Sequence, residues 1–114
     1  MATRTDLKMN FEEAMERIND DRYLTREHVR ADALRRVVWV AEWHLPGCMS
    51  ESRSYSTTKA DAIDAACSMA EDEHGIPPRG MRTALRRYGR FDSQSPMFGT
   101  CVNTVERCTL ADLL

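Results

Sequence analysis

The nine residues from Val37 to Leu45, Val-Val-Trp-Val-Ala-Glu-Trp-His-Leu, constrain the fold of this chain more than any other segment. They contain both tryptophans and the densest run of β-favouring residues. The odd positions are all apolar, whereas the even positions change from valine to Glu42 and then His44. Because successive side chains of a strand point to opposite faces, this alternation predicts a central strand with one face buried along its whole length. The other face is expected to be covered only at its start.

A turn and a returning strand follow the central strand. Pro46 and Gly47 suit the two middle positions of a type II turn, because proline fixes φ and glycine accepts a positive φ. The segment from Glu51 to Thr57 is polar apart from Tyr55, which predicts a strand that is solvated on one face. Together these segments predict a β-hairpin over about 37–57.

A flexible leader over residues 1–9 and a first helix are expected at the N-terminus. Asn10 followed by Glu13 is a capping-box pattern, in which asparagine replaces serine or threonine. Apolar residues then recur at helical spacing: Phe11, Ala14, Met15 and Ile18. The run Asn19-Asp20-Asp21 ends the helix, because these side chains compete for backbone hydrogen bonds.

A second helix is predicted from about Arg26 to Arg36, with Thr25 as its N-terminal cap. The basic residues at its end are favourable for the helix dipole. The alternative is a single bent helix that continues from the first one through Tyr23 and Leu24.

The clearest helix signal lies between Thr58 and Gly75. Thr58 is a good cap, Asp61 is acidic in the first turn, and Gly75 is a stop signal. Its apolar residues are mostly small: Ala62, Ile63, Ala66, Cys67, Met69 and Ala70. Small side chains let a helix approach a sheet closely, so we expect this helix to cover the face of Trp39 and Trp43. We expect the apolar stripe of the first helix to pack on that face as well.

The segment from Arg79 to Phe91 is strongly basic and contains five arginines: Arg79, Arg82, Arg86, Arg87 and Arg90. Its larger apolar residues share one helical face: Met81, Leu85 and Tyr88. This spacing favours a short helix that ends at Gly89. A strand over 85–91 is the rival interpretation.

The remaining segments complete an α+β fold. Residues 92–96 have the composition of a loop, residues 98–108 predict a third strand, and residues 109–114 predict a one-turn helix. Helices and strands are segregated rather than regularly alternating. We therefore expect one domain over 10–114, with a mainly antiparallel three-stranded sheet packed against two to four helices.

Composition limits the classes of function. The chain has 114 residues, of which 42% are hydrophobic and 30% are charged, with a net charge of −2. No apolar run approaches the roughly 20 residues of a membrane span, and the N-terminus has no apolar core like that of a signal peptide. We expect a cytoplasmic protein without a membrane partner, in the host cytoplasm if a phage encodes it.

The cysteines do not predict a metal site. They are Cys48, Cys67, Cys101 and Cys108, and none of their spacings is Cys-x-x-Cys. A zinc site from His44 with Cys48, Cys101 and Cys108 is conceivable but has no recurrent zinc spacing. We expect reduced, mostly buried thiols, no metal and no cofactor.

Catalytic patterns are absent from the sequence. Cys48 or Ser50 could pair with His44 as nucleophile and base, but nothing in the sequence orients such a base. Glu42 and His44 share a strand face, which a solvated polar surface explains equally well. There is no phosphate-binding glycine loop, no Gly-x-Ser-x-Gly and no His-Glu-x-x-His. We therefore expect a protein that is not an enzyme.

The basic segment is the strongest functional signal. Arginine and tyrosine are enriched in interface hot spots, so its five arginines with Tyr88 and Phe91 predict a surface that binds a larger protein or nucleoprotein complex. The alternative is nucleic-acid binding, in which arginines meet phosphates and a ring stacks on a base. A third interpretation is that these arginines pair with the chain's own acidic helices, or with a second copy in a homodimer.

The kind of genetic element that encodes this chain is suggested only by its size and composition, because the sequence contains no motif of a known family. Compact, arginine-rich α+β chains without catalytic patterns are typical of phage and mobile-element accessory proteins of the host-takeover or anti-defence type. The sequence therefore favours an inhibitor or modulator of a larger partner.

Overall fold

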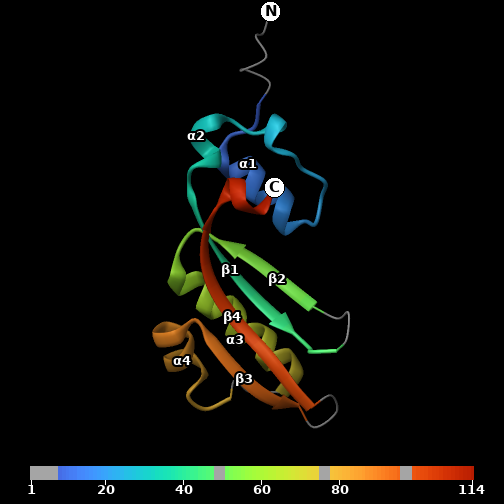
Figure 1. Cartoon of the computed structure of the whole chain (residues 1–114), viewed down its shortest axis with the longest axis vertical. Coiled ribbons are helices and arrows are strands. Elements are labelled where there is room, and N and C mark those ends of the chain that lie inside the picture. Colours follow the sequence, from blue (N-terminus) through green and yellow to red (C-terminus); the bar gives the residue numbers. More distant parts are fainter. Residues whose placement is uncertain (1–7, 48–50, 75–77, 96–98) are drawn as a thin grey trace, which may run out of the picture. The chain divides into compact units, whose positions relative to one another are not determined.

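The computed structural model describes residues 8–47, 51–74, 78–95 and 99–114, and the chain divides into two compact units (Figure 1). The first unit holds the residues up to Val38 together with Cys108–Leu114. The second unit is Trp39–Arg107. The expectation of one domain over 10–114 stays a prediction, and each unit is described by itself.

Helix α1 (Phe11–Asn19) of the first unit begins as predicted. The Asn10 side chain accepts a hydrogen bond from the Glu13 backbone N–H at 2.9 Å, which satisfies one of the free donors of the first turn. Phe11 is buried, and the Arg36 guanidinium lies 4.1 Å from the centre of its ring. The apolar start of α1 therefore forms part of the core of this unit.

The predicted second helix over 26–36 is wrong, and so is the single bent helix. The structure has a 3₁₀ turn, η2 (Arg26–His28), and a four-residue helix, α2 (Ala31–Leu34). Between them Val29 is extended and buried, and it forms a parallel bridge with Met9. The backbone of Met9 bonds to both sides of Val29, at 2.8 Å to the His28 oxygen and at 2.9 Å from the Arg30 nitrogen. Met9, which we placed in the flexible leader, therefore belongs to the folded unit.

The C-terminal turn, η3 (Leu110–Leu113), was predicted as a one-turn helix and is a 3₁₀ helix. Thr109 and Asp112 form a reciprocal capping box, and the hydrogen bond from the Thr109 backbone holds the pKa of Asp112 below its usual value. Leu110 is fully buried, and its N–H donates to the Arg36 oxygen at 3.0 Å. The C-terminus thus closes the first unit.

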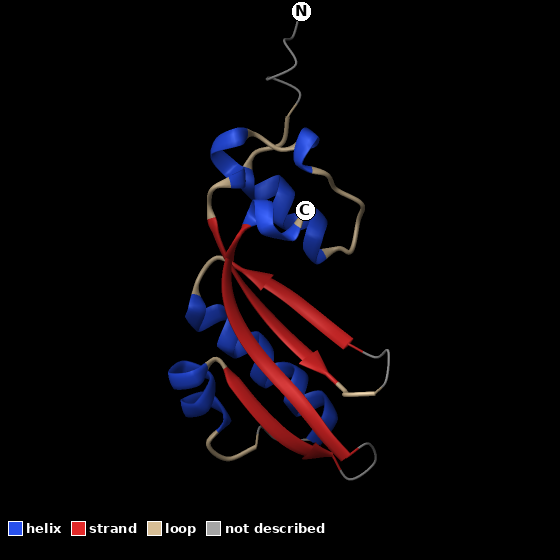
Figure 2. Ribbon diagram, in the orientation of Figure 1, coloured by secondary structure: helices blue, strands red, loops and turns tan. Residues whose placement is uncertain are grey.

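The second unit is built on a four-stranded antiparallel sheet in the order β2-β1-β4-β3 (Figures 1 and 2). The strands are β1 (Val37–His44), β2 (Glu51–Ser56), β3 (Arg90–Ser95) and β4 (Gly99–Thr109), and the first two residues of β1 and the last two of β4 belong to the first unit. The hairpin of β1 and β2 and the long C-terminal strand were predicted. The α+β class is confirmed, but the sheet has one strand more than expected.

The additional strand is β3, which we expected to be a loop from its polar composition. Its residues alternate: Phe91 and Ser93 lie on the inner face, whereas Asp92 and Gln94 are exposed. An edge strand tolerates such outward polar residues, because its backbone hydrogen bonds come from pairing with β4. Composition alone hid this strand because its polar side chains resemble those of a loop.

Two helices, α3 (Lys59–His74) and α4 (Met81–Tyr88), pack on one face of this sheet (Figure 2). The core between these helices and the sheet contains mainly small and aliphatic residues: Ala41, Ala62, Ile63, Ala66, Cys67, Ala70, Met81, Leu85 and Val105. Trp39 and Phe91 pack against this core. The prediction that the alanine-rich helix covers the odd face of β1 is therefore confirmed.

Helix α4 ends at Gly89, as predicted. The rival prediction of a strand over 85–91 is wrong for residues 85–89, because the strand β3 begins only at Arg90. Gly89 has φ +71°, and a Cβ there would lie 2.8 Å from the Val105 backbone oxygen. Its carbonyl accepts the Val105 N–H at 2.9 Å, which ties the end of α4 to β4. Glycine thus permits both the helix stop and the close approach of the two backbones.

Candidate functional site

The basic residues of helix α4 face solvent, because the apolar residues on its other side are buried in the core. Met81 and Leu85 are fully buried in the core. The arginines on the opposite side are exposed: Arg82, Arg86 and Arg87, with Arg79 just before the helix. The periodicity of this segment correctly placed Met81 and Leu85 on the buried side, whereas Tyr88, which it placed on the same side, is exposed.

Two of the five predicted arginines are used within the chain. Arg82 forms an ion pair with Asp64 of α3, and this hydrogen bond raises the pKa of Arg82. Arg90 lies on β3 and pairs with Asp92, with 2.9 Å between Nε and Oδ1, and this bond raises the pKa of Arg90. The interpretation that the arginines pair with the chain's own acidic helices holds for Arg82, whose partner lies on α3, but not for Arg90, whose partner lies on β3.

The other three arginines have no side-chain partner among the residues that the structure describes. They are Arg79, Arg86 and Arg87. Tyr88 follows them and is 77% exposed, which is unusual for a large ring. We call these four residues the α4 surface. Next to it, the Lys59 ammonium donates to the Arg86 carbonyl at 2.8 Å, which adds a cation beside the last turn.

Phe91, which we expected to share this surface, lies elsewhere. It is half-buried and packs against the core beneath α3 and α4. Its backbone carbonyl accepts a hydrogen bond from the buried Asn103 side chain at 3.1 Å. The aromatic part of the candidate site is therefore reduced to Tyr88.

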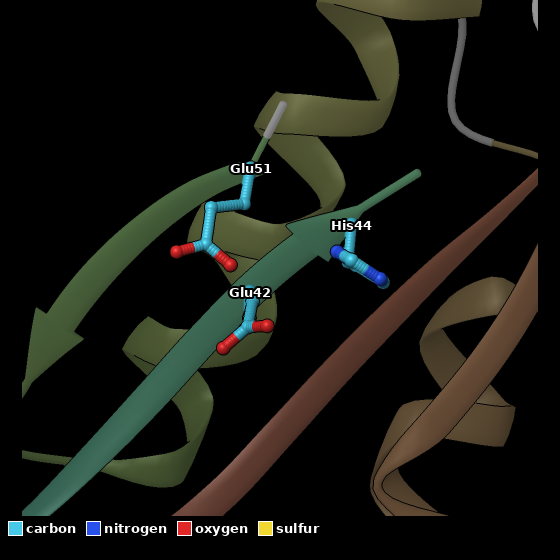
Figure 3. Close-up of side chains that lie close together, drawn as sticks. All are labelled: Glu42, His44 and Glu51. Atoms are coloured by element: carbon cyan, nitrogen blue, oxygen red, sulfur yellow. The ribbon is translucent and has the colours of Figure 1, made fainter. Parts of the chain in front are cut away.

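A second group of charged residues lies on the sheet face opposite α3 and α4, in the hairpin of β1 and β2. We call Glu42, His44, Glu51 and Arg53 the hairpin cluster. The strand register pairs Glu42 with Arg53 and His44 with Glu51. Figure 3 shows Glu42 and His44 projecting from β1 and Glu51 from β2, on the same side of the hairpin. The sequence placed Glu42 and His44 on one face but missed Glu51, whose position depends on the register.

Arg53 joins the two carboxylates of the hairpin cluster. Its Nε lies 3.0 Å from Glu42 Oε2, and its Nη2 lies 3.7 Å from Glu51 Oε1. Partial burial would lower the pKa of Arg53, but the charge of Glu42 and the contacts with Tyr55 and Glu51 outweigh it, so the pKa is raised. Arg53 is thus a firmly charged partner within the cluster.

The cysteines behave as buried thiols where the structure describes them. Cys67 and Cys101 are buried, and Cys108 is half-buried. Burial raises the pKa of the Cys67 thiol, which makes it a weaker nucleophile. Cys48 and Ser50, the candidate nucleophiles beside His44, lie outside the described residues. Among the described residues, the group with metal-ligand geometry contains no cysteine.

Comparison with protein families, with curated proteins and with solved structures found no match. Within the described part of the chain, none of the helices combines the length and the apolar character needed to cross a lipid bilayer. Any functional conclusion therefore has to come from the α4 surface and the hairpin cluster themselves.

Proposed function

We propose that this chain is a small, non-enzymatic interaction protein that docks on a larger macromolecular partner through the α4 surface and inhibits or modulates it. The observation that supports this proposal is a set of three exposed arginines, which have no side-chain partner among the described residues, beside an exposed tyrosine. Arginine and tyrosine are two of the residue types that most often dominate binding energy at protein interfaces. A surface whose arginines pair with no side chain in the described part of the chain is available to an acidic patch on a partner.

The rigid support of the helix that carries the α4 surface also favours binding. Met81 and Leu85 are fully buried, and Lys59 bonds to the Arg86 carbonyl, so the helix has two kinds of support. Side chains presented by a rigid element lose less conformational entropy on association than side chains of a loop. A few anchors on α4 can therefore contribute a large part of the binding free energy.

The number of unpaired cations favours a protein partner over nucleic acid. Proteins that bind duplexes tightly neutralise about 6–10 phosphates, whereas a hot spot needs only a handful of side chains. Arg82 and Arg90 already pair with Asp64 and Asp92, and the chain carries a net charge of −2. Three arginines without a side-chain partner among the described residues suit a compact acidic patch better than an extended phosphate backbone.

The small size, the arginine-rich composition and the absence of catalytic motifs in the sequence also support a more specific class. We propose an accessory protein of a phage or mobile element that acts in the host cytoplasm, of the host-takeover or anti-defence type. Such a protein can act by occupying a surface, which requires affinity but no chemistry. Its partner is expected to present a cluster of aspartate and glutamate.

Affinity capture from nuclease-treated extract of the native host tests this function. The bait is the full chain, compared with Arg86→Ala/Arg87→Ala and with the control Arg35→Ala/Arg107→Ala. The control removes the same charge at two exposed arginines that lack side-chain partners among the described residues. We expect mass spectrometry to find one partner held by the wild type and the control and lost by the α4 variant. Retention of that partner by the α4 variant would overturn the proposal.

The nucleic-acid alternative has its own outcome. At about 50 mM salt electrostatic binding to nucleic acid is strong, so retention of duplex or single-stranded probes is measured there. We expect no retention by the wild type. Salt-sensitive retention that Arg86→Ala/Arg87→Ala abolishes, with protein capture unchanged, would replace the protein partner by nucleic acid.

A further inference from the structure

The hairpin cluster contains three side chains of the kinds that ligate transition metals. One ligand atom each from Glu42, His44 and Glu51 lies within 4.8 Å of the other two. The register of β1 and β2 brings them together, since His44 faces Glu51 and Glu42 lies two residues earlier on the same strand face. We propose that these three residues bind a divalent transition metal ion of the zinc class. Figure 3 shows the three side chains of this site.

The geometry requires only a small contraction to hold an ion. Ligand atoms at about 2.0–2.2 Å from a tetrahedral zinc ion are about 3.4 Å apart, compared with the observed limit of 4.8 Å. Glu42 and His44 are half-buried and Glu51 is exposed, so the carboxylates can close the difference by rotation of their side chains. The strands that carry the ligands are already paired, so the register that brings the ligands together is in place without the ion.

Arg53 is compatible with this site. It contacts Glu42 through Oε2 and Glu51 through Oε1, which leaves one oxygen of each carboxylate for a metal ion. Two carboxylates and one guanidinium leave a net charge of −1 when His44 is neutral, so a cation remains favourable. Ligating carboxylates commonly accept hydrogen bonds from outer residues that orient them. Arg53 is therefore a positioning residue in this proposal.

The mixture of ligands selects the class of ion. One imidazole with two carboxylates suits zinc and its neighbours in the first transition row. Magnesium and calcium prefer oxygen ligands throughout. Three protein ligands on a sheet face also leave a coordination position for water or for a group from another molecule. Because β1 and β2 both contribute ligands, a bound ion would link the two strands.

Calorimetric titration of the purified full chain with zinc chloride, under a non-thiol reductant, tests the site. We expect one saturable site per chain and a melting temperature that rises by several degrees with zinc. His44→Ala should weaken binding at least about tenfold and remove the thermal shift. His28→Ala is the matched control, because His28 is exposed in the first unit and contacts Thr25 rather than a carboxylate. Magnesium chloride should produce neither effect.

A second variant protects the test against misfolding. Glu51→Gln changes an exposed side chain of an edge strand and keeps its size, so we expect an unchanged fold and weakened zinc binding. The absence of saturable zinc binding to the wild type would overturn the proposal. Zinc binding that survives both His44→Ala and Glu51→Gln would also overturn it, because the ion would then be bound elsewhere in the chain. Neither result bears on the α4 surface, since none of these residues belongs to it.

Discussion

The α4 surface and the hairpin cluster are both charged, but they differ in what their charges meet. In the hairpin cluster, Arg53 contacts both Glu42 and Glu51, and all these groups come from two adjacent strands. On the α4 surface, Arg86 and Arg87 have no side-chain partner among the described residues, although Arg82 one turn earlier pairs with Asp64. The difference shows that the number of arginines is a poor guide to function. The pairing of each arginine decides whether it is available to a partner.

The largest effect is expected where the core supports the α4 surface. Leu85 is 0% exposed, and Leu85→Ala should lower the free energy of unfolding by about 2–5 kcal/mol, since it removes buried methyl groups and leaves a cavity. Chemical denaturation followed by circular dichroism measures this change. Arg87→Ala on the same helix should stay within about 0.5 kcal/mol. Equal losses in the two variants would mean that α4 does not present one buried and one free side.

Tyr88 tests whether the α4 surface works through more than charge. Because its ring is 77% exposed, Tyr88→Ala should leave the free energy of unfolding within about 0.5 kcal/mol. If the ring is an interface anchor, the same change should cost about 2 kcal/mol or more of binding free energy to the captured partner. Surface plasmon resonance with that partner measures the loss, and Tyr23→Ala, a second exposed tyrosine, is the control. An unchanged affinity would restrict the surface to its arginines.

Substitution of Gly89, at the end of α4, should lower the stability of the fold for two reasons, one conformational and one steric. Gly89→Ala forces a positive φ on a residue with a Cβ and brings that Cβ to 2.8 Å from the Val105 oxygen, so we expect a loss of about 2 kcal/mol or more. Gly80→Ala is the matched control, because Gly80 has φ +83° but nothing within 4 Å of the added Cβ. It should cost only about 1–2 kcal/mol. Thermal melts of the two variants compare the conformational penalty with the steric one.

Sequence patterns predicted the elements whose apolar residues repeat regularly. The alanine-rich stripe of α3 reflects one buried face. The alternation in β1 located the strand, although Trp39 and Trp43 on the face expected to be buried are only half-buried. The pattern failed where a distant partner decides the structure. Val29 is extended because it pairs with Met9, 20 residues earlier, and that contact interrupts what would otherwise be a helical segment.

Polar residues inside the sheet were the other source of error. Asn103 is 1% exposed, and its Nδ2 donates to the Phe91 carbonyl and to Ser93 Oγ. These partners are in reach only because β3 pairs with β4. The sequence does not show this pairing, and the polar composition of residues 92–96 therefore suggested a loop. The Asn103 Nδ2 group is satisfied by tertiary contacts, which a single sequence does not reveal.

The candidate site was predictable in part for the same reasons. The basic side of residues 79–91 follows from periodicity, but the pairing of Arg82 with Asp64 depends on how α3 and α4 pack. The inward position of Phe91 depends on the strand that was missed. In the hairpin cluster, Glu51 reaches His44 only through the register of β1 and β2. Contacts between secondary-structure elements therefore decide which charged residues are paired within the described part of the chain.

The smallest effect gives the most direct test of this pairing. Arg82 and Asp64 have side chains that are 52% and 62% exposed, so their ion pair should contribute at most about 1 kcal/mol. Arg53 and Glu42 are less exposed, at 47% and 27%, and should couple more strongly within the same range. Double-mutant cycles with alanine, measured by chemical denaturation, give both coupling energies, and salt should reduce the more exposed one further.

Arg86→Ala completes the comparison, because Arg86 lies one helical turn after Arg82 and is equally basic. Without a side-chain partner in the described part of the chain, its loss should change the free energy of unfolding by less than the loss of Arg82 does. A cost equal to that of Arg82→Ala would show that Arg86 is also held within the chain. The α4 surface would then have two free arginines instead of three, and its resemblance to an interface hot spot would weaken accordingly.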